Sequence, residues 1–215
     1  METIVKKVAG PKIDFRLMND TIKTIYERRS VRKYKTKPVE RNLIWQIVDA
    51  GRMAPSAINK QPWGFYILTD KEVIKDFSKE ISKAVIKGFI KSGIRGIVKA
   101  GKDFFHFSHG IDFLKEEDSI FHGAPVVIFI TSPKDNEWAT LDIGMCSQNI
   151  MLAAKSLGLD SCPVGLGKFV EETKIFSRLN VPNSEQVNLA LIIGYGDEHP
   201  EAKERMKNNL IFVEG

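Results

Sequence analysis

Residues 142–159 read Asp142-Ile143-Gly144-Met145-Cys146-Ser147-Gln148-Asn149-Ile150-Met151-Leu152-Ala153-Ala154-Lys155-Ser156-Leu157-Gly158-Leu159. Their apolar side chains recur at helical spacing, which predicts a long buried helix over about 138–157. Polar residues interrupt the apolar run, so a membrane span is not indicated. Gly158 stands where a left-handed residue ends a helix. Residues 160–164 then predict a core strand that leads directly into Gly165-Leu166-Gly167.

Further helices and strands alternate on both sides of this segment. Helices are predicted from Asn19 or Asp20, from Pro38, from Asp70, and over 170–179. Strands are predicted over 65–68, 126–130 and 187–195. The alternation lacks strict βαβ regularity, so it favours an α+β fold with a central mixed β-sheet over a regular doubly wound one.

The composition is that of an ordinary globular chain. Of the 215 residues, 43% are hydrophobic and 27% are charged. A length of roughly 100–200 residues per domain predicts a single domain over residues 1–215. The 32 Lys and Arg residues exceed the 27 Asp and Glu residues, so the net charge is +5. These values exclude a collagen-like chain, a disordered chain and a small disulfide scaffold.

The cysteines and the first residues bear on the compartment. Cys146 and Cys162 are the two cysteines, too few for a zinc site and not a secreted disulfide pattern. They indicate a reducing compartment. Lys6 and Lys7 are not followed by an apolar signal core. We therefore expect a cytoplasmic protein.

Arg28-Arg29-Ser30-Val31-Arg32 is the first candidate binding segment. It follows a helix whose apolar face is already complete. Its guanidinium groups and hydroxyl suit a phosphate or another anion, because arginine donates two hydrogen bonds at once and stays charged. The same residues could instead form a solvated helix end, where cations interact with the negative end of the helix dipole.

Two loops are further candidates. Residues 55–63 read Pro-Ser-Ala-Ile-Asn-Lys-Gln-Pro-Trp, whose rigid prolines and short polar side chains can hold amide groups against a flat, polar ring. The loop could equally be a plain connection with Trp63 in the core. The glycines of 165–167 let backbone N–H groups approach a ligand closely. The third glycine of a dinucleotide fingerprint is missing, so that motif is not present.

Several other patterns carry no chemistry. Residues 96–102 spell the P-loop consensus G-x-x-x-x-G-K, but Asp103 replaces the Ser or Thr that binds magnesium and no strand precedes it. His106 and His109 are three residues apart without an acidic or Cys partner, so we expect no metal site. The chain has no G-x-S-x-G elbow and no Cys with a nearby His, so no acyl-transfer nucleophile is predicted.

Four segments, in order along the chain, together resemble the motifs of the nitroreductase family of FMN-dependent NAD(P)H oxidoreductases. They are Arg28 to Arg32 (R-R-S-x-R), Ala54 to Trp63 (A-P-S-x-x-N-x-Q-P-W), Asp142 to Leu159 (D-x-G-x-x-x-Q-N-x-x-L-A-A-x-x-L-G-L), and Gly194-Tyr195 with Pro200, Lys203 and Arg205 (G-Y…P-x-x-K-x-R). The resemblance covers about residues 20–206. Residues 82 to about 120 depart from the pattern and are interpreted as a variable insertion.

The resemblance implies an intertwined homodimer with a mixed sheet flanked by helices and two FMN sites at the subunit interface. The FMN phosphate and the pyrimidine side of the flavin would be bound by residues from both ends of the chain: Arg28, Arg29, Ser30, Arg32, Lys203 and Arg205. The partner subunit's loop would line the ring with four residues: Pro55, Ser56, Ala57 and Asn59. Backbone near the flavin N5 would come from four residues: Val164, Gly165, Leu166 and Gly167. Asp142 would be a further contact.

The same resemblance implies that the flavin N5 carries the hydride, so no side chain is expected to be catalytic. NADH or NADPH would be the reductant, and a nitroaromatic, quinone or related flat electron-poor acceptor would follow in a ping-pong cycle. A flavoenzyme of this fold with another reaction, such as reductive dehalogenation or flavin breakdown, is the alternative. A non-enzymatic module for nucleic acid would need aromatic residues among exposed cations, and Phe89 and 104–107 look like core.

The insertion is basic and amphipathic. From Ile81 to Lys102 it has no acid and six cations: Lys83, Lys87, Lys91, Arg95, Lys99 and Lys102. Apolar residues interleave with these cations, and four glycines weaken the helical pattern. The segment could pack its apolar face on the core, form a lid that shapes the acceptor site, or contact an anionic membrane surface. We favour packing over the lid, and both over membrane contact.

Overall fold

The computed structural model describes the backbone of residues 4–7, 18–105, 118–206, 209 and 211–214. It describes side chains within 18–88, 118–206, 209, 211 and 213. The middle of the expected insertion, with His106 and His109, lies outside the described residues.

An antiparallel four-stranded sheet in the order β2-β3-β5-β4 forms the centre of the molecule. Its strands are β2 (Gly64–Leu68), β3 (Val126–Pro133), β4 (Asp160–Val164) and β5 (Glu185–Gly194). Every strand predicted from the sequence is present, and β3 continues past the predicted end at residue 130. The long β3–β5 pairing, in which Phe129 lies opposite Ala190, places two strongly apolar strands in the middle of the sheet.

The α+β fold with a helix-flanked central sheet is confirmed, with one difference in strand direction. All the paired strands in the central sheet run antiparallel. The parallel component of the expected mixed sheet is an isolated bridge between Ser30 and Ser161, on the outer side of β4. The segment that follows α1 thus lies along the edge of the sheet, although it forms no named strand.

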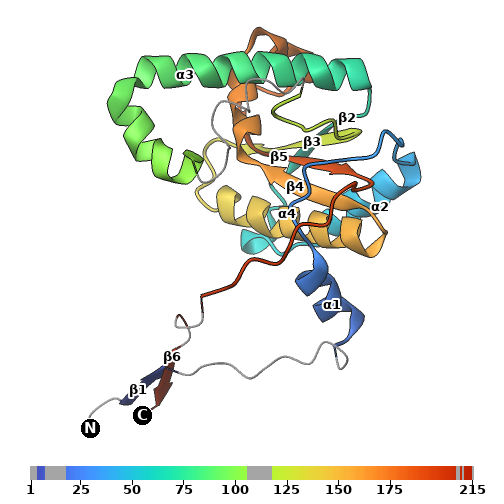
Figure 1. Cartoon of the computed structure of the whole chain (residues 1–215), viewed down its shortest axis with the longest axis vertical. Helices are drawn as coiled ribbons and strands as arrows, with labels where there is room; N and C mark the ends of the chain where they lie inside the picture. The colour runs from blue at the N-terminus through green and yellow to red at the C-terminus, as the bar shows by residue number, and fades with distance from the viewer. Residues whose placement is uncertain (1–3, 8–17, 106–117, 207–208, 210, 215) are drawn as a thin grey trace.

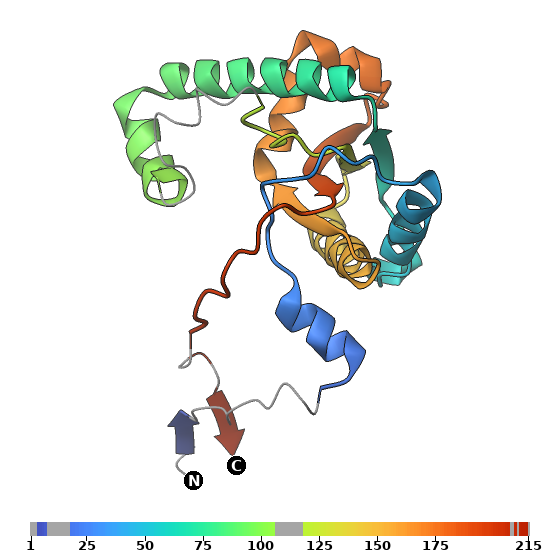
Figure 2. The ribbon, with the colours of Figure 1, turned by 45° about the vertical axis from the view of Figure 1, so that its right-hand side comes forward.

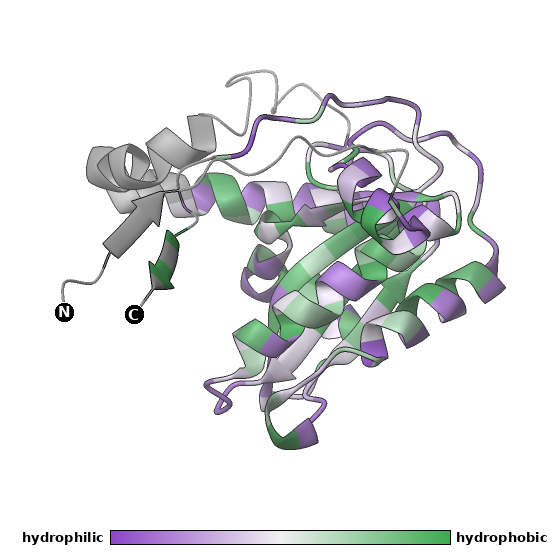
Figure 3. Ribbon diagram, turned by 90° about the horizontal axis from the view of Figure 1, so that it is seen from below, coloured by the Kyte–Doolittle hydropathy of each residue, from purple (hydrophilic) through white to green (hydrophobic). Residues whose placement is uncertain are grey.

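Helices cover both faces of the sheet (Figure 1). On one face lie α3 (Lys71–Phe105) and the 3₁₀ segments η4 (Gly165–Glu172) and η5 (Lys174–Leu179). On the other lie α2 (Arg41–Arg52) and α4 (Ala139–Ser156). Strand β3 contributes to both layers, because its alternate side chains point to opposite faces and those of residues 126–132 are all buried. Figure 3 shows the hydrophobic residues concentrated in these central strands.

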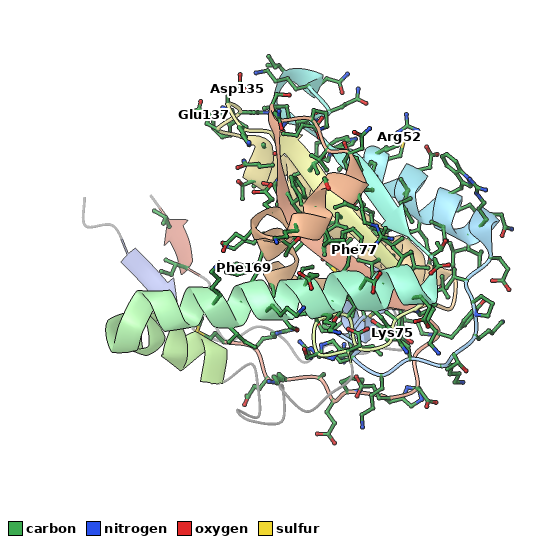
Figure 4. The ribbon with its side chains drawn as sticks, turned by 90° about the horizontal axis from the view of Figure 1, so that it is seen from above. Arg52, Lys75, Phe77, Asp135, Glu137 and Phe169 are labelled. Carbon is green, nitrogen blue, oxygen red and sulfur yellow. The ribbon has the colours of Figure 1, made fainter. Side chains whose placement is uncertain are left out.

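Helix α3 begins as expected and runs further than expected. The Asp70 carboxylate accepts hydrogen bonds from the N–H groups of residues 72 and 73, at 3.0 and 2.9 Å. Phe77 lies against the sheet, its ring 5.9 Å from that of Phe129 (Figure 4). Ile81 is also buried, and so are Ala84 and Val85, so the first residues of the expected insertion belong to the core. The P-loop-like residues 96–102 lie within the same helix, which agrees with their dismissal.

Two helix predictions need correction. Helix α2 begins at Arg41 and not at Pro38, because Glu40 is still extended (φ −63°, ψ 136°). Residues 170–179 form no α-helix; they divide between η4 and η5 at Thr173 (φ −102°, ψ 153°). The Thr173 hydroxyl donates back to the Val170 carbonyl at 2.6 Å, which favours this interruption. The predicted end of α4 is confirmed, since Gly158 has φ +76°.

The two ends of the chain leave the body together (Figures 1 and 2). Near the N-terminus, β1 (Ile4–Lys7) pairs antiparallel with β6 (Ile211–Glu214) near the C-terminus. Helix α1 (Asp20–Glu27) is capped as predicted, with Asn19 Oδ1 accepting from the Ile22 N–H at 2.9 Å. This helix has no buried residue, and its apolar side chains remain exposed.

Gly51 and Gly88 provide a matched test of the packing between α2 and α4. An added Cβ at Gly51 would lie 2.5 Å from Ile150 Cγ1 on α4, whereas one at Gly88 on α3 would meet nothing within 4 Å. Gly51→Ala should therefore lower the free energy of unfolding by about 1–3 kcal/mol through overpacking. Gly88→Ala should raise it by up to about 1 kcal/mol through helix propensity. Denaturant unfolding followed by circular dichroism measures both, and changes of the same sign would contradict this account.

Candidate functional site

Arg28 ends helix α1 and lies close to Arg205 of the C-terminal segment. Burial and, next, the nearby charge of Arg205 lower the pKa of the Arg28 guanidinium. Its Nε is buried without a hydrogen-bond partner among the described residues. Two like charges held together, with an unused buried donor, form a site that an anion would stabilise. Arg28 belongs to the first of the four motifs and Arg205 to the last, so the two motifs lie close together in space.

Arg29 has a different role in this segment. Its guanidinium donates to the Tyr26 carbonyl and, at 2.8 Å, to the Arg28 carbonyl, at the end of α1. This is the helix-end interaction that was the alternative interpretation of the whole cluster. Its Nε is nevertheless buried without a partner among the described residues, so one donor is left for a ligand.

Backbone pairing joins this segment to β4 and to the C-terminal segment. The Val31 N–H donates to the Ser161 carbonyl at 3.1 Å, beside the Ser30–Ser161 bridge. A second bridge joins Tyr34 to Gly196. The Arg32 N–H donates to Glu198 Oε1 at 2.5 Å. These contacts hold residues 30–34 against β4 and against residues 196–198, where the segment that leads to Arg205 begins.

Glu198 and Cys162 belong to this site, although the sequence did not single them out. Glu198 holds the backbone of Arg32. It is one of several acids in residues 197–204, so the sequence offered no signal that would single it out. Cys162 lies beneath the cations. Burial raises the pKa of its thiol, while Arg32, a hydrogen bond with Ser30, and Arg28 partly oppose that shift. The Ser161 hydroxyl is buried there without a partner among the described residues.

Lys203 is exposed on the same C-terminal segment as Arg205. Its part in anion binding stays a prediction. Residues 164–167 lie at the opposite end of β4, where the strand passes directly into η4. Gly165 faces open space, as a ligand-approaching residue would. At Gly167 a Cβ would instead collide with the Ala190 Cβ, so close packing on β5 already requires that glycine.

The loop of residues 55–61 has an unusual backbone. It contains η2 (Ala57–Asn59), and Ile58, Asn59 and Gln61 have φ of 47°, 58° and 48°. Left-handed φ is uncommon for a β-branched residue such as Ile58, whose side chain is 87% exposed. Within the loop, Ser56 Oγ accepts from the Gln61 N–H at 2.9 Å. Pro55 and Asn59 are exposed, and Ser56 and Ala57 are half-buried.

Asp142 lies under this loop, in the first turn of α4. Its Oδ1 accepts a hydrogen bond from the Ala57 N–H at 3.3 Å. The side chain is 3% exposed, and Oδ2 has no partner among the described residues. Asp142 therefore contacts the loop that was expected to line the ring.

The loop and the arginines of one chain do not meet. Asp142 lies in the first turn of α4, whereas Lys155, in its last turn, pairs with Asp160 at the start of β4 at 3.1 Å. Thirteen residues of α-helix separate them, roughly 20 Å at about 1.5 Å per residue. Ser30, and with it Arg28, borders that far end through Ser161. One chain thus presents two half-sites about a helix length apart.

Within the described residues, no group of three or more His, Cys, Asp and Glu side chains could hold a metal ion. No described helix is both long and apolar enough to cross a membrane.

Known proteins resemble this chain over most of its length. A 4-nitrobenzoate reductase of Pseudomonas putida is 28% identical over 202 residues, which are 85% of this chain and 88% of that protein. An iodotyrosine deiodinase of Thermotoga neapolitana is 29% identical over 188 residues, 87% and 92% of the two chains. A crystal structure of a nitroreductase with bound FMN from Bacteroides fragilis superposes with a TM-score of 0.72 at 25% identity, covering 92% of this chain and 100% of that one.

The family model described as the nitroreductase family matches residues 25–195. That range contains the arginine segment, the loop, α4 and β4, which carry most of the geometry described above. The chain belongs to the nitroreductase family.

Proposed function

We propose that the chain is an FMN-dependent oxidoreductase that uses NADH or NADPH to reduce a flat, electron-poor acceptor such as a nitroaromatic or a quinone. One observation carries the proposal: Arg28 and Arg205 come from distant parts of the chain, repel each other, and leave a buried donor unused. A phosphate would satisfy both needs. The family and the FMN in the related crystal structure support FMN as the phosphate compound that binds here.

The residues of the arginine half-site fit the phosphate end of FMN. Arg28, Arg29 and Arg205 supply charge, and the Ser30 hydroxyl and Arg32 lie on the same backbone segment along β4. Lys203 would add a further cation from the exposed C-terminal segment. When bound, FMN supplies the redox chemistry by exchanging a hydride at N5 with the nicotinamide and then with the acceptor, in a ping-pong cycle. The chain's own residues bind and orient it.

The remaining half-site fits the flavin ring, but a second copy of the chain is needed to bring it there. Pro55, Ser56, Ala57 and Asn59 lie roughly 20 Å along α4 from the arginines of their own chain. In a homodimer this loop would line the ring held by the other chain. Residues 164–167, at the end of β4, would present backbone near N5.

Exposed apolar side chains support the homodimer. Ile22, Ile25 and Tyr26 of α1 are 40%, 43% and 38% exposed and lie on one face of a helix with no buried residue. Met53, next to the loop, is 71% exposed. Apolar groups gathered beside an incomplete site favour association with another copy. The β1–β6 ribbon projects from the body (Figure 2) and would pack against that copy.

A second reaction deserves a test, because one relative is an iodotyrosine deiodinase. Reductive dehalogenation would use the same FMN site and a halogenated aromatic acceptor. A screen of acceptors for stimulated NAD(P)H oxidation should include nitroaromatics, quinones, flavins and iodotyrosine. The class that gives the highest kcat/KM decides between the two reactions. We also propose a cytoplasmic location, since both cysteines are buried free thiols and suit a reducing compartment.

The purified protein should be yellow, with about one FMN per chain, and should be a dimer. The expectation follows from the split between the arginine half-site and the loop half-site. Absorbance near the flavin bands gives the stoichiometry, and light scattering after gel filtration gives the mass. A colourless monomer that binds no added FMN would contradict the proposed function.

Arg28→Ala and Arg205→Ala should each weaken FMN binding by roughly 10–100-fold, because a charge-assisted hydrogen bond contributes about 1.5–3 kcal/mol. Fluorescence quenching during titration of apoprotein with FMN measures the affinity. Saturating FMN should restore much of the activity. Arg52→Ala is the matched control: it also removes one positive charge, from an exposed pair with Asp49 at 3.2 Å. Equal losses in all three variants would refute the assignment.

Replacing residues 89–117 by an eight-residue Gly/Ser linker should leave the flavin spectrum intact and change the relative rates among acceptors. Such a linker reaches about 26–29 Å when extended. The replacement retains the buried Ile81 and Val85 and the Ser82–Ser119 hydrogen bond of 2.8 Å, so the core remains. It removes five Lys and Arg residues and four Asp and Glu residues, so the net charge changes by only one unit. Unchanged relative rates among acceptors would favour the packing interpretation.

A further inference from the structure

The Asp142 carboxylate is buried more deeply than its known contacts explain. It is 3% exposed, and of its two oxygens only Oδ1 has a described partner, the Ala57 N–H at 3.3 Å. Burial of a carboxylate is costly unless hydrogen bonds and nearby positive potential offset it. The first turn of α4 supplies part of that potential through its helix dipole. The Ala57 N–H is the one hydrogen-bond donor to this carboxylate among the described residues.

The loop depends on this one contact. Its other hydrogen bonds close on themselves, from Gln61 to Ser56 and Asn59 at 2.9 and 3.2 Å. Among the described residues, the bond from Ala57 to Asp142 is the one that joins residues 56–61 to another element. A loop with three left-handed φ values and a single external bond has its orientation set by that bond.

We propose that Asp142 is a positioning residue that sets the ring-facing geometry of this loop and so acts on the flavin bound by the arginines of the second chain. The inference rests on the proposed function, and it differs from the expectation that Asp142 is itself a flavin contact. Asp142 and the arginines of its own chain lie near opposite ends of α4. Its effect on FMN must therefore pass through Ala57 and across the dimer.

A carboxylate suits this task better than a neutral side chain. A hydrogen bond to an ionised acceptor is roughly twice as strong as one between neutral groups. Oδ2 also remains as an acceptor that no described residue uses. It can receive one further donor when a second chain and a flavin complete the site.

The first experiment compares Asp142→Ala, Asp142→Asn and Asn149→Ala in the FMN-loaded dimer. Asn149 is the matched control, because from the same helix its Nδ2 donates to the Ala50 carbonyl at 3.3 Å, away from the loop. Asp142→Ala should weaken FMN binding about tenfold and alter the visible circular dichroism of the bound flavin. Asp142→Asn keeps an acceptor oxygen, so its FMN affinity and its flavin circular dichroism should both lie close to those of the wild type. Asn149→Ala should change neither. Asp142→Ala with unaltered affinity and spectrum would overturn the proposal.

The second experiment asks which flavin Asp142 serves. Hybrid dimers of an Asp142→Ala chain and an Arg28→Ala chain, purified with two different tags, contain one site with both defects and one with neither. The hybrid should therefore bind one FMN per dimer with wild-type affinity, although both parent homodimers bind weakly. Two weak sites would show that Asp142 acts within its own chain and would overturn the proposal. A wild-type protein that is monomeric or binds no FMN would instead refute the proposed function itself.

Discussion

The proximity of two like charges, Arg28 and Arg205, is the constraint on which the proposed phosphate site depends. Such a pair is unfavourable alone, since burial and mutual repulsion both lower the pKa of Arg28. Backbone contacts hold the segment that carries Arg28 in place: one bridge to β4, one to Gly196, and the Glu198 carboxylate on the Arg32 N–H. The sheet edge is thus the base on which the arginine segment and residues 196–198 rest.

The long helix α4 determines how far apart the two candidate half-sites of one chain lie. Its buried face packs on the sheet, so its length fixes how far the loop lies from the arginines of the same chain. In the proposed homodimer, each chain would supply the half-site that the other chain lacks. A substitution that weakened the dimer would then also weaken the cofactor site.

Much of this arrangement follows from the sequence. Strong periodicity predicted α4, its end at Gly158 and every strand of the central sheet, because buried elements repeat apolar residues at fixed spacing. The arginine segment was singled out from its residue chemistry, and the resemblance to the family implied that Arg205 lies beside it. The division of labour between Arg28 and Arg29 was not predictable, because it depends on which guanidinium reaches the last carbonyls of α1. The 3₁₀ segments and the contact from Asp142 to Ala57 depend on tertiary packing, which single-residue patterns do not encode.

The β1–β6 ribbon has a consequence for the topology of the chain as a polymer. Ile4 lies opposite Glu214, so β1 and β6 bring the first and last described residues side by side. Joining β1 to β6 by a short peptide would cost little loop-closure entropy. New ends could then be opened elsewhere on the surface, giving a circularly permuted protein with the same sheet. Two domains fused to β1 and β6 would likewise lie next to each other, which would favour contact between them.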